Sequence, residues 1–434
     1  MQEKQPRLPD TGTVPDGNPS LTPSEYLTAF TGPRTQPTQV DTISVGSLTV
    51  PRFTNEFWTA QQRQASSIHE ISYRACFKPQ LPGFFIHLLT RPGDVVYDPF
   101  SGRGTTAIEA GLSGRCVCAN DANPLSRIMT CPRFFPPTQD EVALRLETIP
   151  RDGERADIDL SMFYEQATER EIVALREYLL ARKADGTEDA IDRWIAMVAT
   201  NRLTGHSPGF FSVYTLPPNQ AVSQESQKKI NQRRMQVPEY RDTHRIIRKK
   251  TKSLLSTLTD TEKQTLNRAG ETARFFTGDA RATPLIPELS VQLTVTSPPF
   301  LDIVQYKQDN WLRCWFTGID GDKVGKQITM ARTLASWTKV MGAVFTELHR
   351  VTRNGGYVAF EVGEVRKKTI RLEEHVVPLG CAAGFSCEGI LINQQQFTKT
   401  SNIWGVDNMA GGTNTNRIVL FCKDPSRKAP PVLS

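Results

Sequence analysis

Asp94-Val-Val-Tyr-Asp98-Pro-Phe-Ser-Gly102-Arg-Gly104-Thr-Thr-Ala107 is the segment on which our fold assignment rests. Residues 95–97 are apolar and follow a Pro-Gly pair, which predicts a short buried strand. The two glycines predict a tight turn that lets a ligand approach the main chain. Residues 105–112 predict a helix with a small face toward a sheet. Exposed amides at the start of that helix would attract a carboxylate or a phosphate.

The same glycines belong to a longer pattern. Gly102-x-Gly104-x-x-Ala107 fits the dinucleotide-binding fingerprint, including its permitted final alanine. A second apolar strand is predicted at 116–119 and ends in Asn120-Asp121, about twenty residues past the glycines, where an acid reaches ribose hydroxyls. These residues predict a nucleoside-containing cofactor and leave NAD and S-adenosylmethionine as alternatives. A glycine turn that only packs is the third interpretation.

Length and composition set the class of protein. The chain has 434 residues, a net charge of +6 and a pI near 8.8, which suits a polyanionic partner without proving one. Its 8 cysteines form no Cys-x-x-Cys pair and have no histidine cluster beside them, so we expect neither a metal site nor a disulfide framework. No apolar run approaches the roughly eighteen residues of a membrane span, and the N-terminus lacks a signal-peptide pattern. We expect a cytoplasmic protein.

Three motifs resemble a known family. Asp98-Pro-Phe-Ser-Gly-Arg-Gly-Thr-Thr resembles the cofactor loop of the DNA amino-methyltransferases, which typically read D-P-F-x-G-x-G-T, and Asp121-Ala-Asn-Pro124 resembles their D-x-N-P ribose-binding turn. Thr296-Ser297-Pro298-Pro299-Phe300 resembles their catalytic S-P-P-Y/F motif, particularly in the N4-cytosine branch. The resemblance covers residues 68–135 and 273–423, to within a few residues. It implies an α/β fold, a Rossmann-like class I methyltransferase sheet, and S-adenosyl-L-methionine as the cofactor.

The resemblance also implies a set of cofactor-binding residues. A segment before the glycine loop wraps the methionine end of the cofactor in this family, although Phe77-Lys78-Pro replaces the more usual His-Pro-x-x-Phe-Pro pattern here. The alternative is a simple helix start entered by prolines. Gly278-Asp279-Ala-Arg follows a predicted strand, and in the family this acid accepts a hydrogen bond from the adenine amino group. The full set is Phe77, Lys78, Asp98, Pro99, Phe100, Gly102, Gly104, Thr105, Asp121 and Asp279.

The catalytic motif lies at the carboxyl end of a predicted strand, where open α/β sheets place their ligands. An exocyclic amino group is a poor nucleophile, because its lone pair is delocalised into the ring. The Ser297 hydroxyl and the Pro298 carbonyl would accept its hydrogens, and the Pro298-Pro299 pair would hold both acceptors in position. Phe300 would stack on the base after it leaves the duplex. A proline turn that only ends a strand is the alternative interpretation.

The first residue of the motif bears on the target base. Serine, rather than aspartate or asparagine, indicates cytosine N4, although some members with serine methylate adenine N6. Methylation at C5 would need a nucleophilic cysteine, usually in a Pro-Cys pair. Cys131-Pro132 has the reverse order, so we assign it no chemistry.

Residues 138–270 interrupt the family pattern and are predicted to be mostly helical, with apolar residues at helical spacing. Within them, a basic stretch has few acids and an apolar side formed by Ile246, Ile247 and Leu254, which predicts a packed helix with a cationic outer face. Such a face would contact phosphates in a salt-dependent way; an ordinary solvated helix is the alternative. The predicted DNA-binding residues are Lys228, Lys229, Arg233, Arg234, Arg245, Arg248, Lys249 and Lys250.

These interpretations combine into one organisation. We expect a disordered polar tail at 1–45, the methyltransferase core at 46–137 and 271–424, a helical insertion at 138–270 as the target-recognition region, and a tail at 425–434. The expected function is site-specific transfer of a methyl group from S-adenosylmethionine to cytosine N4 in double-stranded DNA. The resemblance adds a role in restriction-modification with a cognate endonuclease.

Three rivals remain open. The first keeps the chemistry and changes the target to adenine N6 in DNA or to a base in RNA. The second is an NAD-dependent oxidoreductase, which leaves Ser297 to Phe300 unexplained. The third is a DNA-binding protein with a degenerate methylase fold.

Overall fold

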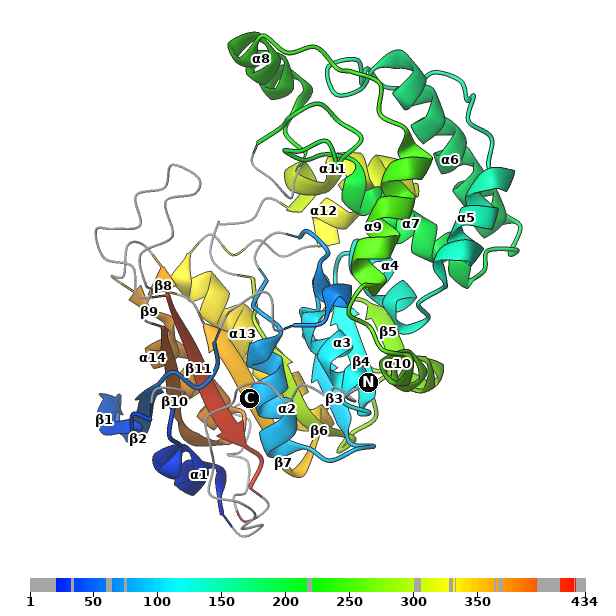
Figure 1. The fold of residues 1–434 in the computed structure, drawn as a ribbon. Coiled ribbons are helices and arrows are strands. Elements are labelled where there is room, and N and C mark those ends of the chain that lie inside the picture. The colour runs from blue at the N-terminus through cyan, green and yellow to red at the C-terminus, as the bar shows by residue number, and fades with distance from the viewer. Residues whose placement is uncertain are drawn as a thin grey trace.

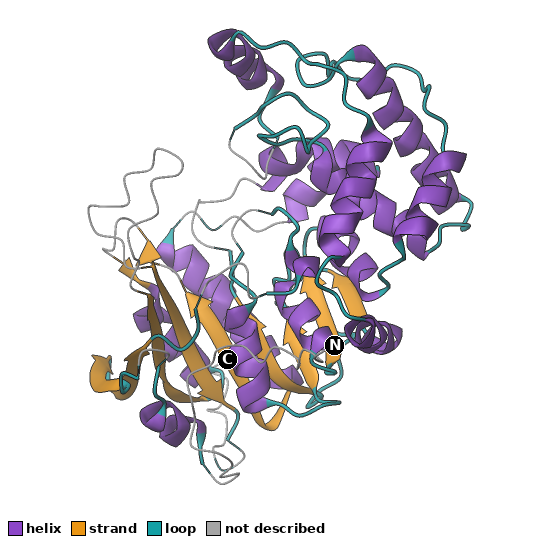
Figure 2. Cartoon of the chain, in the orientation of Figure 1, coloured by secondary structure: helices purple, strands orange, loops and turns teal. Residues whose placement is uncertain are grey.

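The computed structural model describes residues 21–32, 35–59, 65–73, 76–216, 221–299, 306–327, 331, 333–362, 364–365, 370–395, 414–424 and 426. Within these ranges the chain forms a large twisted sheet with helices on both faces, and a mostly helical region beside one end of the sheet (Figure 1). Figure 2 shows the same division, with strands confined to the sheet part and helices dominating the other.

The sheet confirms the predicted α/β, Rossmann-like class. Its nine strands lie in the order β1(Gln39–Val45), β2(Leu48–Asn55), β10(Ser386–Gln395), β11(Asn414–Cys422), β7(Thr352–Val362), β6(Val291–Thr296), β3(Val95–Asp98), β4(Cys116–Asp121), β5(Arg274–Thr277). The strands from β7 to β5 are parallel, and β11 runs antiparallel to both of its neighbours. Two short strands, β8(Glu364–Val365) and β9(Ile370–Arg371), pair separately.

Alternate residues of the strands face two separate apolar clusters, as the two-residue period of a strand requires. Val96 lies in the cluster that includes α2(Gln80–Leu89), α3(Thr105–Leu112) and α10(Asp260–Thr272). Tyr97 lies in the cluster that includes α13(Leu334–Val351) and α14(Leu372–Ala382). The central strands are therefore buried on both faces, which explains their continuous apolar runs.

The chain leaves the sheet after β4 and returns at β5 through a series of helices. These are α4(Leu125–Thr130), α5(Gln139–Thr148), α6(Gln166–Ala184), α7(Ala190–Arg202), α8(Gln224–Arg234), α9(Thr243–Leu255) and α10. Two later helices, α11(Tyr306–Thr317) and α12(Gly321–Gln327), lie beside them (Figure 1). The Trp311 indole on α11 donates a hydrogen bond to the Val222 carbonyl, 3.2 Å away. The chain segment after the catalytic motif is thus attached to the helical region.

The described residues include a helix and a strand inside the predicted N-terminal tail, residues 1–45. Residues 23–29 form α1(Pro23–Ala29), which starts with a capping box between Thr22 and Glu25. Leu27 and Phe30 are buried, and the Phe30 ring lies 5.1 Å from that of Phe57. Strand β1 then pairs with β2 at the sheet edge. The prediction of a disordered tail is therefore wrong for these residues. A few apolar side chains, such as Leu27 and Phe30, are enough to pack them against the rest of the protein.

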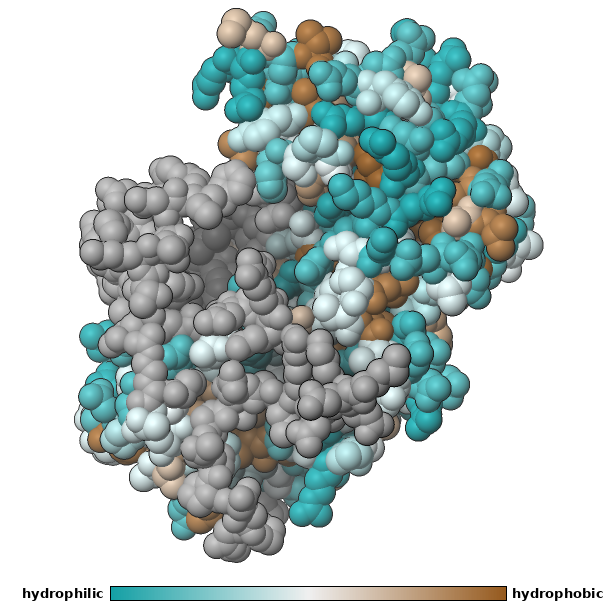
Figure 3. All heavy atoms as spheres, in the orientation of Figure 1, coloured by the Kyte–Doolittle hydropathy of each residue, from teal (hydrophilic) through white to brown (hydrophobic). Residues whose placement is uncertain are grey.

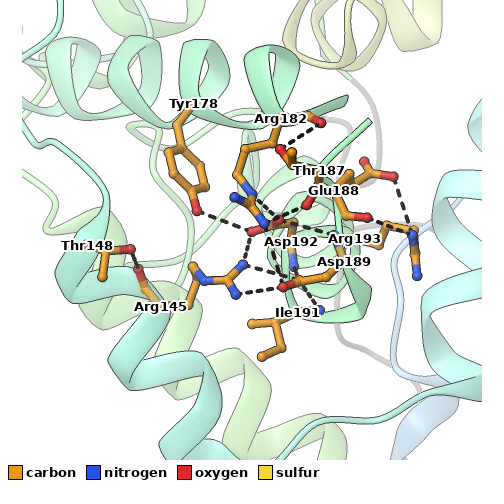
Figure 4. Close-up of polar contacts among 10 residues, drawn as sticks. All are labelled: Arg145, Thr148, Tyr178, Arg182, Thr187, Glu188, Asp189, Ile191, Asp192 and Arg193. Atoms are coloured by element: carbon orange, nitrogen blue, oxygen red, sulfur yellow. Dashed lines mark hydrogen bonds and ion pairs between the residues drawn. The ribbon is translucent and has the colours of Figure 1, made fainter. Parts of the chain in front are cut away.

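An ion network around the buried Asp192 joins three helices of the helical region (Figure 4). The fully buried Asp192 carboxylate on α7 accepts hydrogen bonds from Arg145 on α5 and from Arg182 on α6, whose Nε lies 2.5 Å away. Asp189 caps the start of α7 and also accepts from Arg145, with 2.6 Å between Oδ2 and Nη2. Helices α5, α6 and α7 are therefore joined through the carboxylates of Asp192 and Asp189.

Replacing Asp192 by alanine is expected to lower the free energy of unfolding by about 3–5 kcal/mol, because two arginines would lose their buried partner. Urea unfolding measures this change. The matched control is Asp152→Ala, which removes an exposed ion pair with Arg170 of 2.9 Å and should cost less than about 1 kcal/mol. Equal effects of the two substitutions would contradict the role of the network.

Candidate active site

The cofactor loop and the catalytic motif lie side by side at the point where the order of the strands reverses. From β3 the chain adds β4 and β5 on one side, whereas β6 and β7 extend the sheet on the other. Strands β3 and β6 are parallel neighbours, so the loops that follow them both start at the carboxyl ends of the strands, next to each other. Ligands of open α/β sheets bind at this position.

Asp98 joins the two loops. It is the last residue of β3 and is buried. Its Oδ1 accepts hydrogen bonds from the Thr296 hydroxyl on β6, at 2.6 Å, and from the Phe100 amide, at 3.1 Å. Burial raises the pKa of this carboxyl to about 7, although both hydrogen bonds oppose the shift. The carboxyl thus fixes the start of the cofactor loop relative to the end of β6.

The glycine loop has the backbone that its sequence requires. Gly102 and Gly104 have φ values of 52° and 75°, in the left-handed region. A Cβ atom on Gly104 would lie 2.3 Å from the Thr130 side chain, so no larger residue fits there. The Ser101 hydroxyl is buried and has no hydrogen-bond partner among the described residues. That unsatisfied hydroxyl fits a polar ligand at the loop.

The two acids predicted to contact the nucleoside have different surroundings. Asp121 accepts hydrogen bonds from the amides of Gly102 and Asn123, both at 2.8 Å, and burial raises its pKa to about 6. Asp279 follows β5, is about half exposed, and forms an ion pair of 2.5 Å with Arg281, which lowers its pKa. Asp121 therefore holds the glycine loop directly, whereas the Asp279 carboxylate is shared with an arginine.

The remaining predicted cofactor residues lie around the same loop. The Pro99 carbonyl accepts a hydrogen bond of 3.3 Å from Asn120, and the Thr105 hydroxyl accepts one of 3.2 Å from Arg103. Phe77 is partly buried against the apolar cluster that includes α2 and α3. Burial and the nearby charge of Arg103 both lower the pKa of Lys78. The loop is thus braced largely by its own neighbours.

The segment before α2 is attached to the glycine loop. Arg103 donates a hydrogen bond to the Ile71 carbonyl at 2.8 Å, and His69 Nε2 lies 2.6 Å from the Glu109 carboxylate on α3. The Tyr73 ring lies beside Gly102, 3.6 Å from where a Cβ would be. Residues 69–73 therefore lie against the cofactor loop.

The catalytic motif follows β6, and Ser297, Pro298 and Pro299 are described; Phe300 lies outside the described residues. The Trp337 indole on α13 donates a hydrogen bond of 3.0 Å to the Pro299 carbonyl, which fixes the proline turn. The Ser297 hydroxyl is hydrogen-bonded to Glu361 on β7, whose carboxylate also accepts a hydrogen bond of 2.5 Å from the Asn416 side chain on β11. Burial raises the pKa of Glu361 to about 7.

Sequence reasoning missed Glu361. The signal was present, because Tyr-Val-Ala-Phe-Glu361-Val is an apolar run that contains one acid, and it forms the carboxyl end of β7. A charged residue at such a position is a candidate functional residue. Its closeness to Ser297 depends on the pairing of β6 with β7, in which Thr296 lies opposite Phe360.

The predicted DNA-binding residues lie on two helices. Lys228, Lys229, Arg233 and Arg234 are exposed on α8, and Arg245, Arg248 and Lys249 are exposed on α9. Helix α9 buries Ile246, Ile247 and Leu254 on its other side, as the pattern predicted. Lys250 differs, because its side chain is only 11% exposed and lies 3.6 Å from Glu70. Burial and Arg202 lower its pKa to about 8.

Comparisons with known proteins bear on the segment that contains the glycine loop. Residues 29–125 match the model of the DNA methylase family. This match spans the cofactor loop, β4 and the Asp121-Ala-Asn-Pro124 turn. A comparison with curated protein sequences gives no match.

Several solved structures are similar to parts of the chain. One is a Thermus thermophilus protein assigned as a DNA modification methylase, with 21% identity, a TM-score of 0.21, and coverage of 35% of this chain and 53% of that protein. The chain thus spans about half the length of that protein, which has also been solved with S-adenosyl-L-methionine. A SAM-dependent methyltransferase from Methanosarcina mazei aligns with 10% identity, a TM-score of 0.29, and coverage of 78% and 97%. An rRNA methyltransferase from Streptomyces viridochromogenes aligns with 10% identity and a TM-score of 0.32. The alignment covers 83% of this chain and 90% of that protein.

Two features are absent from the described ranges. No group of three or more histidine, cysteine, aspartate or glutamate side chains there could hold a metal ion. No helix in these ranges is long and apolar enough to cross a membrane.

Asp98→Asn is expected to stabilise the ligand-free protein at pH 8 by an amount on the order of 2 kcal/mol. The folded state raises the pKa of Asp98 to about 7. The stability that the protonated Asp98 carboxyl contributes is therefore fully present below about pH 4, the pKa of aspartate in the unfolded chain. This stability is lost as the pH rises through 7. Asparagine stays neutral and can keep both hydrogen bonds, because Thr296 and Phe100 both donate to Oδ1.

Urea unfolding of both proteins between pH 4 and pH 8 measures this difference, which should shrink toward the acid end. A constant difference across that range would show that Asp98 does not titrate there.

Proposed function

We propose that this protein is an S-adenosylmethionine-dependent DNA methyltransferase that modifies an exocyclic amino group, with cytosine N4 as its target. The observation that carries the proposal is the hydrogen bond between Thr296 and Asp98, which holds a Ser-Pro-Pro turn beside a glycine-rich cofactor loop. The match of residues 29–125 to the DNA methylase family supports the same class of enzyme.

The residues around the glycine loop fit the cofactor. S-adenosylmethionine would supply an activated methyl group. The unsatisfied Ser101 hydroxyl would offer a hydrogen bond to it, and Asp121, at the end of β4, is the residue that we propose for the ribose. Asp279, at the end of β5, is the acceptor proposed for the adenine amino group, and it would share its carboxylate with Arg281.

The catalytic residues have a division of labour that follows from their contacts. Ser297 donates its own hydrogen to Glu361, so its lone pairs are free to accept a hydrogen bond from the amino group of the base. The Pro298 carbonyl is the second acceptor. Together they draw electron density from the N–H bonds and make the nitrogen lone pair available. Most of the rate enhancement would come from holding that nitrogen in line with the methyl group.

Methyl transfer also releases a proton. The bond from nitrogen to the methyl carbon would form as the bond from sulfur to that carbon breaks, and the methylated amino group would then lose one hydrogen. Glu361 is the acceptor that we propose, with Ser297 passing the proton on. A carboxyl whose pKa is near 7 is about equally able to take and release a proton at neutral pH, which suits a general base.

Two further assignments rest on the sequence. Serine at position 297 favours cytosine N4, with adenine N6 as the alternative target. The exposed cations of α8 and α9 favour double-stranded DNA as the substrate, since contacts of this kind bind phosphates. Restriction-modification with a partner endonuclease is the biological setting that we propose.

Nucleoside mass spectrometry of DNA from cells expressing the protein tests the function. We expect N4-methylcytosine with the wild-type chain and none with Ser297→Ala. The matched control is Ser290→Ala, just before the other end of β6, whose hydroxyl only bonds the Pro287 carbonyl at 2.7 Å. N6-methyladenine instead would correct the base, and the absence of both marks would refute DNA amino methylation.

Glu361→Gln is expected to lower kcat by about 100-fold or more, because glutamine cannot take the proton. The wild-type rate should rise with pH up to about 7, the pKa of Glu361, as that carboxyl ionises. The pKa of Asp98 is also about 7, so the pH profile of the wild type alone does not identify the group responsible. The pH profile of the Glu361 variant identifies it. In Glu361→Gln the rise should disappear, whereas a variant that keeps both the rate and the pH profile would exclude Glu361 as the base.

A further inference from the structure

Met235 is an apolar residue in two unfavourable situations at once. It follows α8 with φ 49° and ψ 43°, a left-handed conformation that residues with a side chain adopt at an energetic cost. Its side chain is also 93% exposed to solvent, so it gains nothing from packing. Glycine or asparagine would suit such a helix end better. Neither the stability of α8 nor the core of the protein accounts for a methionine here.

A network of side-chain amides holds the turn in place. Gln236 donates hydrogen bonds to the Tyr214 carbonyl at 2.9 Å and to Asn231 Oδ1 at 2.8 Å. The buried Gln227 donates to the same two oxygens, at 3.0 and 2.7 Å. Asn231 in turn donates to the Met162 carbonyl at 2.8 Å. The network fixes the backbone on both sides of Met235, so the methionine is held out into solvent by an ordered support.

The surroundings of the tip are cationic. Arg233 and Arg234 precede Met235 and are exposed, and the Arg234 guanidinium lies 3.7 Å from the centre of the Tyr214 ring. Val237, two residues further on, is 78% exposed. In Figure 1, α8 forms the end of the helical region farthest from the sheet, and Figure 3 shows hydrophobic surface among hydrophilic surface at that end of the molecule.

We propose that Met235 is the tip of a DNA-contacting turn and packs into a groove of the duplex against carbon atoms of the bases and sugars. This inference rests on the proposed DNA substrate. The neighbouring arginines would bind phosphates on either side of the groove, which positions the turn. Apolar side chains, methionine among them, serve as groove contacts and wedges in proteins that bind DNA. The rigid support and the positive charge together favour DNA as the partner.

The test compares Met235→Gly with Leu289→Gly. Leu289 is the matched control, because it is also a non-glycine residue at positive φ, 53°, and is 51% exposed, but it lies before the amino end of β6, at the edge of the sheet opposite the site. Glycine relieves the backbone strain at both positions. Neither substitution should therefore lower the midpoint of urea unfolding.

Fluorescence anisotropy with a labelled mixed-sequence duplex, at a series of NaCl concentrations, measures binding by the full chain. We expect Met235→Gly to weaken binding about tenfold at every salt concentration, as the loss of one buried apolar side chain would. The slope of log K against log salt should stay unchanged, because no phosphate contact is lost. Arg233→Gln should instead reduce that slope by about 1. Leu289→Gly should match the wild type.

Three outcomes would overturn the inference. Met235→Gly could bind the duplex as tightly as the wild type while the wild type methylates DNA, which refutes the inference and leaves the proposed function intact. Its loss of affinity could be accompanied by the loss of a wild-type dimer in light scattering, which would make the tip an interface between copies. A wild-type chain that neither binds the duplex nor leaves a methyl mark would refute the proposed function together with this inference.

Discussion

The hydrogen bond between the Thr296 hydroxyl and Asp98 is the contact on which the geometry of the site depends. It crosses from β6 to β3 at the point where the strand order reverses, so it joins the two loops that carry the family motifs. Both groups are buried, and the two oxygen atoms lie 2.6 Å apart. The Ser-Pro-Pro turn therefore starts from a residue that is bonded to the start of the cofactor loop.

The sheet extends this constraint to Glu361, the proton acceptor that we propose. Pairing of β6 with β7 sets Phe360 opposite Thr296, so Glu361 on β7 corresponds to Ser297, the residue directly after β6. Strand β11 supplies Asn416 from the other side. A single register therefore assembles a hydroxyl, a carboxylate and an amide from three strands. A shift by one residue would turn each of these side chains to the opposite face of the sheet.

The sequence sufficed for those parts of the site that local chemistry determines. The turn at Gly102 and Gly104 needs positive φ, and its motif could be read directly because only glycine adopts that backbone freely. Glu361 was missed because its meaning depends on which strands are neighbours. Lys250 was placed on the exposed face of α9, but its contact with Glu70 comes from a segment 180 residues earlier. Whether Lys250 or Arg248 faces solvent is a tertiary question that composition cannot answer.

Local rules are broken at several places in this chain, and the surroundings decide which of these has a function. Leu289 and Met235 share a left-handed backbone and exposure to solvent, but only Met235 lies on an amide-braced turn next to exposed arginines. Asp98 and Glu361 are acids with raised pKa values, a state that opposes folding at neutral pH. Asp98 contacts the end of β6 and Glu361 contacts Ser297, so this loss of stability falls on residues beside the proposed site. Strain alone is weak evidence of function; strain supported by a rigid and chemically matched setting is much stronger.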